Sequence, residues 1–159
     1  MVKKTKKQRV DVKNSIGRTQ YKKVLQKIDY DNVCPFCPKH FFKYHTQPII
    51  HKGKYWFVTK NFEPYKGSKT HLLLVHKNHI EHISDLKKEA WYELLGHLTW
   101  VSKKFKLKGE TLVMRYGDTR YNGASVNHLH AQIISGVAHT TKNTRLIKTV
   151  VGFGMQNKK

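Results

Sequence analysis

The segment that most constrains the fold is residues 128–135, in which polar and apolar residues alternate. Side chains of a β-strand point to opposite faces in turn, so His128, His130 and Gln132 are expected on one face. The apolar residues between them then lie on the other face, where they can be buried. Two imidazoles and an amide in a row, directly after the turn at 123–126, are typical of an active site. The alternative interpretation is a half-exposed strand with solvated histidines.

The rest of the chain predicts an α+β fold around this strand. Apolar patterns predict helices over 19–29 and 85–106, strands over 71–75 and 111–116, and a hairpin over 48–60. Ser84 is expected to be the N-cap of the long helix. Its core-facing residues at helical spacing are Trp91, Leu94, Leu95, Leu98, Val101 and Phe105. Because strands and helices do not alternate regularly, we expect an antiparallel sheet of about five strands, one long helix and a short N-terminal helix.

Charge divides the chain into a central part and two basic ends. The 159 residues include 31 Lys+Arg and 10 Asp+Glu, which gives a net charge of +21. A chain of this length suits one domain. We expect a basic, disordered arm over 1–18, a catalytic domain over 19–139, and a basic tail over 140–159 that can add an edge strand at 146–151. Such a basic protein attracts polyanions, including nucleic acid. The alternative is that the basic ends are solvated and have no fixed partner.

Cysteine content and hydropathy favour a reducing, aqueous compartment. The two cysteines cannot form a disulfide framework, and no apolar run reaches the ~18 residues of a membrane span. The N-terminal residues lack the apolar region of a secretory signal. A cytoplasmic location without membrane contact is therefore the expectation.

The pair Cys34-x-x-Cys37 is the second group of residues that carries chemistry. Two thiolates at this spacing chelate zinc or act as a redox pair, and the sequence alone leaves both open. A zinc site needs two more ligands, for which the chain offers histidines: His40, His45, His79, His82 and His128.

Several motifs between residues 34 and 135 together resemble the histidine triad (HIT) superfamily. The sequence His128-x-His130-x-Gln132 is similar to the family's H-x-H-x-H signature. The glutamine resembles the branch of galactose-1-phosphate uridylyltransferase and the diadenosine polyphosphate phosphorylases. Residues 61–65 are similar to the nucleoside-contacting loop, and residues 70–79 to the strand that follows it and ends in a histidine. Ser125 stands where the family has a phosphate-contacting serine.

This resemblance implies roles for individual residues. His130 would be the nucleophile that forms a nucleotidyl-histidine, with Ser125 and Gln132 as catalytic partners. A structural zinc would be held by Cys34, Cys37, His79 and His128, with His40 and His82 as competing ligands. The nucleotide-binding residues would be Asn61, Phe62, Asn122, Gly123, Ser125 and Gln132.

The implied function is a nucleotidyl transferase or nucleotide hydrolase that cleaves a nucleoside phosphate anhydride, with dinucleoside polyphosphates as the first candidates. Because an amide cannot deliver a proton, Gln132 favours leaving groups that are already good. Two alternatives stay open. One is a HIT-like enzyme acting on nucleic-acid 5′ ends, and the other is a non-catalytic basic protein associated with RNA or the ribosome. Small members of the family pair as dimers, so a homodimer is a further expectation.

Overall fold

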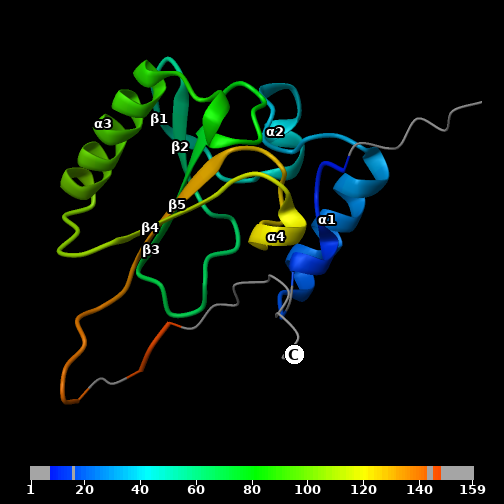
Figure 1. Cartoon of the computed structure of the whole chain (residues 1–159). Coiled ribbons are helices and arrows are strands. Elements are labelled where there is room, and N and C mark those ends of the chain that lie inside the picture. The colour runs from blue at the N-terminus through cyan, green and yellow to red at the C-terminus, as the bar shows by residue number, and fades with distance from the viewer. Residues whose placement is uncertain (1–7, 16, 143–144, 148–159) are drawn as a thin grey trace, which may run out of the picture.

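The computed structural model describes residues 8–15, 17–142 and 145–147. Five strands form one antiparallel sheet in the order β1-β2-β3-β5-β4, which confirms the expected α+β class. Helices α1 and α3 lie on opposite sides of this sheet (Figure 1). The strands are β1 Ile49–Lys52, β2 Trp56–Lys60, β3 Thr70–His76, β4 Thr111–Arg115 and β5 His130–Ser135. The helices are α1 Thr19–Asp31, α2 Pro38–Tyr44, α3 Lys88–Lys104 and α4 Thr119–Asn122, with short 3-10 helices η1 Val12–Asn14 and η2 Ile83–Asp85.

The sheet separates two apolar clusters, as the alternation in β5 predicts. Leu129, Ala131 and Ile133 are fully buried in the cluster on the α3 side, together with Trp56 and Val58. The opposite cluster packs α1 and α2 against alternate residues of β2 and β3. His130 and Gln132 face this second side, because they alternate with the residues buried under α3.

The long helix begins later than the sequence predicts. Ser84 lies inside η2 and is not the N-cap of α3, because its backbone N–H donates to His82 Nδ1 and closes a separate short turn. Helix α3 starts at Lys88. Leu95 was expected to face the core, but 57% of it is exposed. It follows the buried Leu94 and is rotated by about 100° from it around the helix axis, which turns it to solvent.

Strand β5 is also shorter than expected, since it begins at His130 and not at His128. The two preceding residues are held by other segments. The Leu129 N–H donates to Ile80 O at 2.7 Å, and His128 Nε2 donates to His76 O at 2.6 Å. His128 therefore does not share a regular strand face with His130.

Residues 8–15 lie against the domain, although the sequence assigns 1–18 to a disordered arm. Val10 is 2% exposed, forms a β-bridge with Val126 and belongs to the cluster under α1. The Asp11 N–H also donates to Ser125 O at 2.9 Å. An apolar residue amid basic ones thus anchors this segment. The tail's expected strand over 146–151 falls mostly outside the described residues, and residues 145–147 are not in a strand.

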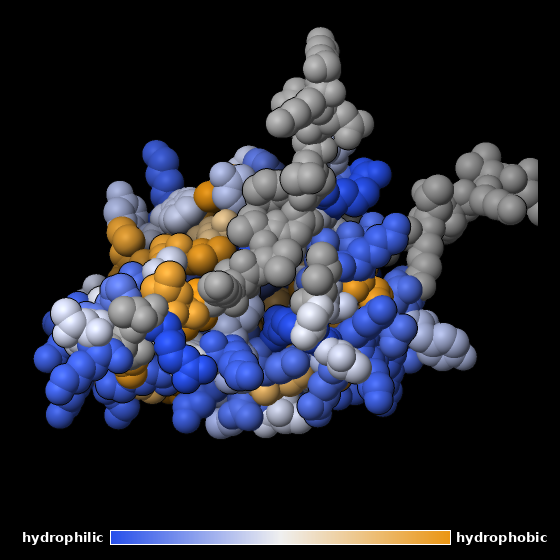
Figure 2. Space-filling view, turned by 90° about the horizontal axis from the view of Figure 1, so that it is seen from below, coloured by the Kyte–Doolittle hydropathy of each residue, from blue (hydrophilic) through white to orange (hydrophobic). Residues whose placement is uncertain are grey.

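One face of the described surface is mainly hydrophilic. Figure 2 shows one face on which blue residues predominate, with smaller orange patches between them. Among the described helices, none is long and apolar enough to cross a membrane.

Candidate active site and metal centre

His130 is positioned by β5 with its imidazole in one tautomer. It is buried, and its Nδ1 lies 2.7 Å from His128 O. A carbonyl oxygen only accepts, so Nδ1 carries the hydrogen and Nε2 keeps a free lone pair. Burial also lowers the pKa of His130 to about 4. The ring of Phe36 contacts this imidazole edge-on at a centroid distance of 4.9 Å, which restricts its rotation.

Gln132 is oriented by a histidine whose role the sequence analysis missed. His71, on β3, accepts a hydrogen bond at Nδ1 from the Tyr65 N–H (3.1 Å). Its Nε2 therefore carries the hydrogen and donates to Gln132 Oε1 at 2.9 Å. This fixes the amide so that its NH₂ group is the end left to donate. Burial lowers the pKa of His71 to about 4, which keeps its ring neutral. The sequence gives no sign of this pairing, since it depends on the register between β3 and β5.

A pocket lies beside these residues, on the side of the sheet that α1 covers. The expected site residues that line it are Asn61, Phe62, Gly123, Ser125, His130 and Gln132. Gly123 ends α4 with a positive φ of 69°, a conformation that favours glycine, and so turns the chain into the pocket. Asn122 does not line the pocket. Its amide group bonds Tyr116 O and its Oδ1 accepts from the Ala124 N–H, so it shapes the turn.

Two arginines and a tyrosine join the pocket without having been expected there. Arg115 on β4 pairs in register with His130 and lines the same pocket. Arg18 and Tyr21 reach it from the start of α1. Ser125 Oγ donates to Asn14 O at 3.2 Å, which ties the expected phosphate-contacting serine to the N-terminal segment. No motif in the sequence identifies these residues, because each depends on tertiary packing.

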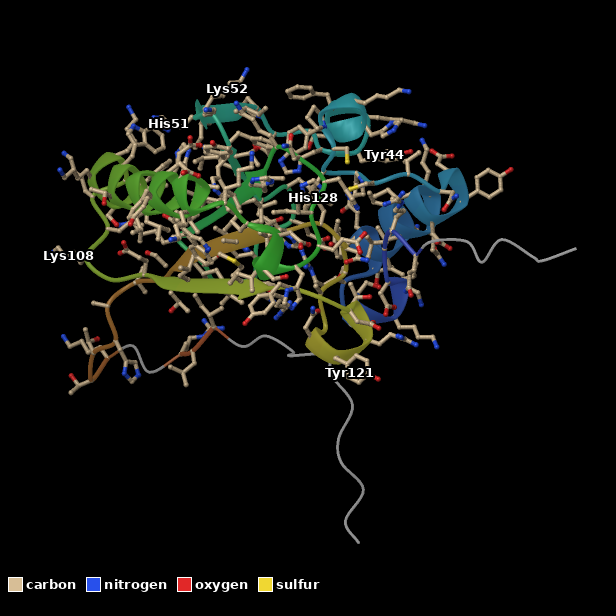
Figure 3. All side chains as sticks on the ribbon, turned by 45° about the horizontal axis from the view of Figure 1, so that its top comes forward. Tyr44, His51, Lys52, Lys108, Tyr121 and His128 are labelled. Carbon is tan, nitrogen blue, oxygen red and sulfur yellow. The ribbon has the colours of Figure 1, made fainter. Side chains whose placement is uncertain are left out.

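Cys34, Cys37, His79 and His128 form one cluster whose ligand atoms all lie within 4.8 Å of one another. The Nδ1 atoms of the two histidines are 3.2 Å apart, and Cys34 Sγ and Cys37 Sγ lie 3.3 and 3.9 Å from His128 Nδ1. A tetrahedral zinc with ordinary bond lengths requires ligand separations of about 3.3–3.8 Å. The residues therefore fit such an ion. His40 and His82, the competing candidates, do not belong to this cluster. Figure 3 shows His128 in the interior, whereas the labelled lysines lie at the periphery.

The surroundings of the cluster also suit a metal. His128 Nε2 donates to His76 O, and His79 Nε2 lies 2.9 Å from the acceptor Glu81 Oε1 as well as 3.0 Å from Arg9 Nη1. Such bonds leave Nδ1 of each ring as the ligand atom. Burial raises the pKa of the Cys34 thiol to about 12, so its thiolate needs a cation beside it. The cluster could therefore hold a metal ion through four protein ligands.

Comparison with known proteins places the fold in one class. Residues 45–139 match the HIT domain. The chain therefore belongs to the HIT family. A comparison with curated proteins gave no match. The two cysteines and α1 lie before the matched residues.

Two solved structures show the same fold. One is a HIT family hydrolase from Clostridium thermocellum, with 20% identity, a TM-score of 0.52, and coverage of 62% of this chain and 87% of that chain. The other is a hypothetical histidine triad nucleotide-binding protein from Sulfolobus tokodaii strain 7. It has 19% identity, a TM-score of 0.52, and coverage of 71% of this chain and 76% of that chain.

Proposed function

We propose that this protein is a nucleotidyl transferase or hydrolase that cleaves a nucleoside phosphate anhydride through a covalent intermediate on His130. The observation that carries the proposal is the imidazole itself. Its Nδ1–H is bound to a carbonyl, its Nε2 has a free lone pair, and the residue lines a pocket. Membership of the HIT family supports a nucleotide as the substrate.

The reaction follows from these groups in two displacements. Nε2 attacks the α-phosphorus, an N–P bond forms, and the P–O bond to the leaving phosphate breaks with its electron pair on that oxygen. Water or a phosphate oxygen then attacks the same phosphorus and releases His130. Gln132 lines the pocket and would donate from its NH₂ group to phosphate oxygens as charge develops, and the Ser125 hydroxyl would do so on exchanging its bond to Asn14 O for one to the substrate.

The amide of Gln132 restricts which leaving groups the substrate can carry. Its Oε1 is held by His71, so the residue presents an amide and not an acid to the pocket. An amide cannot protonate a poor leaving group. The substrate is therefore an anhydride with a phosphate leaving group, such as a dinucleoside polyphosphate. This substrate class agrees with the resemblance of the His-x-His-x-Gln sequence to the transferase branch.

We further propose that the Cys34, Cys37, His79 and His128 cluster holds a structural zinc. Four protein ligands complete a tetrahedron, so such an ion fixes the fold and takes no part in the displacements. It would join the two cysteines before α2 to His79 and to His128, which lies two residues before β5.

The test of the function is covalent labelling. The protein is incubated with a panel of α-³²P-labelled nucleotides and dinucleoside polyphosphates, quenched, and analysed for label by peptide mapping. We expect label on His130 and none in His130→Ala. The far-ultraviolet circular dichroism spectrum of this variant should match that of wild type, which would show that the fold is intact. His139→Ala, which alters an exposed histidine after β5, is the matched control and should keep the label. Normal turnover by His130→Ala would place the nucleophile elsewhere.

A further inference from the structure

The pocket is built partly by residues that lie outside the matched HIT domain. The match begins at residue 45, yet several residues of the N-terminal segment line the pocket. They are Asn14, Arg18, Tyr21, Val24, Leu25 and Ile28. The segment before α2 is therefore a wall of the site.

Arg18 is the charged group of this wall, and its guanidinium is held in place. Its Cζ lies 4.3 Å from the centroid of the Tyr21 ring and 5.5 Å from that of Tyr65. Its Nη2 donates to Glu63 O and lies 3.7 Å from Glu63 Oε2. Contact with aromatic faces orients a guanidinium while its in-plane N–H groups stay available.

Those remaining donors have no partner among the described residues. A guanidinium has five N–H groups, and only Nη2 of Arg18 makes a described hydrogen bond. The Nη1 and Nε groups are therefore free to bind a ligand. Tyr21 lines the same pocket as Ser125 and His130, so the Arg18 guanidinium on its ring lies on the wall of the site that holds the reacting groups.

The charge of the pocket indicates what that ligand is. Two of the described lining residues, Arg18 and Arg115, are arginines, and none is Asp or Glu. Among the described residues, Arg115 has no carboxylate partner. Glu63 Oε2, 3.7 Å from Arg18, offsets part of that charge, but the two arginines leave the pocket positive, which favours an anion. Guanidinium groups bind phosphate oxygens in a bidentate manner.

We propose that Arg18 binds the phosphate chain of the substrate and makes the enzyme selective for nucleotides with several phosphates. This inference rests on the proposed function, since it assigns the substrate's phosphates to the same pocket. It makes the N-terminal segment part of the active site, so the domain begins before residue 19. Arg18 is a specificity-determining residue contributed by a segment that the family match does not include.

The test compares ADP and adenosine as ligands of the full chain. Each is titrated into wild type, Arg18→Gln, Arg18→Lys and Lys23→Gln, and binding is followed by NMR up to millimolar concentration. Lys23 is an exposed lysine of α1, so Lys23→Gln removes the same charge from the same helix without touching the pocket. Thermal unfolding of each variant confirms that binding is measured on folded protein.

We expect wild type to bind ADP more tightly than adenosine. Arg18→Gln should weaken ADP binding by about tenfold or more, the range for a lost hydrogen bond to a charged group, and change adenosine binding less than about twofold. Arg18→Lys should retain part of the preference, and Lys23→Gln should retain all of it.

Three results would overturn the inference. These are an ADP affinity that Arg18→Gln leaves unchanged, an equal loss of ADP and adenosine binding, and a wild type that binds ADP no better than adenosine. The two proposals can fail independently. If His130 takes no label while Arg18→Gln still weakens ADP binding, the covalent mechanism is wrong and the role of Arg18 stands.

Discussion

At the scale of single residues, the proposed mechanism makes Gln132 the residue that selects the acceptor of the nucleotidyl group. Its Oε1 is occupied by His71 Nε2–H, and an amide cannot accept a proton from water in the second displacement. An imidazole at this position could do so, and the His71 N–H could still bond to one of its nitrogens.

Gln132→His should therefore shift the products from transfer to phosphate toward hydrolysis, by about tenfold or more. The measurement is the ratio of the two products, resolved by chromatography, when water and inorganic phosphate compete for the labelled intermediate. Gln132→Asn keeps an amide and is the matched control, with an unchanged ratio. An equal ratio in Gln132→His and wild type would show that this residue does not select the acceptor.

Cys34 is the residue on which the proposed zinc can be tested most directly. Its sulfur is buried and lies 3.3 Å from His128 Nδ1. Elemental analysis should find about one zinc per chain, because four protein ligands complete one tetrahedral site. Cys34→Ser should lower both the zinc content and the thermal unfolding midpoint, since structural metal binding contributes to folding free energy.

His40→Ala is the matched control for the zinc test. It removes a competing candidate ligand on α2 that lies outside the cluster, so it should keep its zinc. Metal-free wild type that unfolds at the same temperature as zinc-bound wild type, or a Cys34→Ser variant that keeps its full zinc content, would contradict the ligand assignment.

At the scale of elements, the segment that carries η1 behaves as part of the domain. Val10 packs in the cluster beneath α1, and its bridge to Val126 joins the segment to the turn before β5. Removal of residues 1–18 would therefore take away a core residue and Arg18 together, and not only a charged arm.

Val10→Ala should lower the free energy of unfolding by about 1–3 kcal/mol, the range for deleting buried methyl groups. The measurement is equilibrium unfolding in urea. Val137→Ala makes the same chemical change at a residue that is 67% exposed and should alter stability by less than about 0.5 kcal/mol. Equal values for the two variants would mean that residues 8–15 do not pack on the domain in solution.

The sequence predicted the helices and strands better than it predicted their boundaries and their packing against one another. Alternation and helical spacing identified the five strands, α1 and α3, because burial on one face imposes a period on the chain. The start of α3 was wrong because the His82 side chain closes η2 ahead of it. Helix α2 was not expected, since its seven residues are too few to show a period.

For the site, the resemblance to the HIT family pointed to His130 and Gln132, which line the pocket, and to the four residues that form the Cys/His cluster. Arg18, His71 and Arg115 could not be predicted, because their positions follow from sheet register and helix packing. A single sequence does not encode those distances in any local pattern.

At the scale of the whole molecule, the net charge of +21 exceeds what a nucleotide pocket needs. Four lysines lie within residues 1–7, ahead of the segment that Val10 anchors. If these lysines contact phosphates, the affinity for single-stranded RNA should fall steeply with salt. A plot of the logarithm of the binding constant against the logarithm of the salt concentration should have a slope of about −0.7 for each phosphate neutralised.

Deletion of residues 1–7 should then reduce this slope by up to about three units, as measured by fluorescence anisotropy over a salt series. Turnover of a free nucleotide should not change, because every residue of the proposed site lies after residue 7. An unchanged slope would mean that these lysines contact no phosphate.

The peptide at residue 128 connects the cluster to the proposed nucleophile. Its side chain faces the two cysteines, while its carbonyl oxygen accepts the hydrogen bond that orients His130. A substitution at position 128 therefore removes the ligand atom and, if the backbone moves with it, also shifts the carbonyl that orients His130. Position 34, on a distant stretch of chain, affects the cluster without touching that carbonyl. The carbonyl is present whatever the side chain at position 128, so loss of the ligand there would reach His130 only through a shift of the backbone.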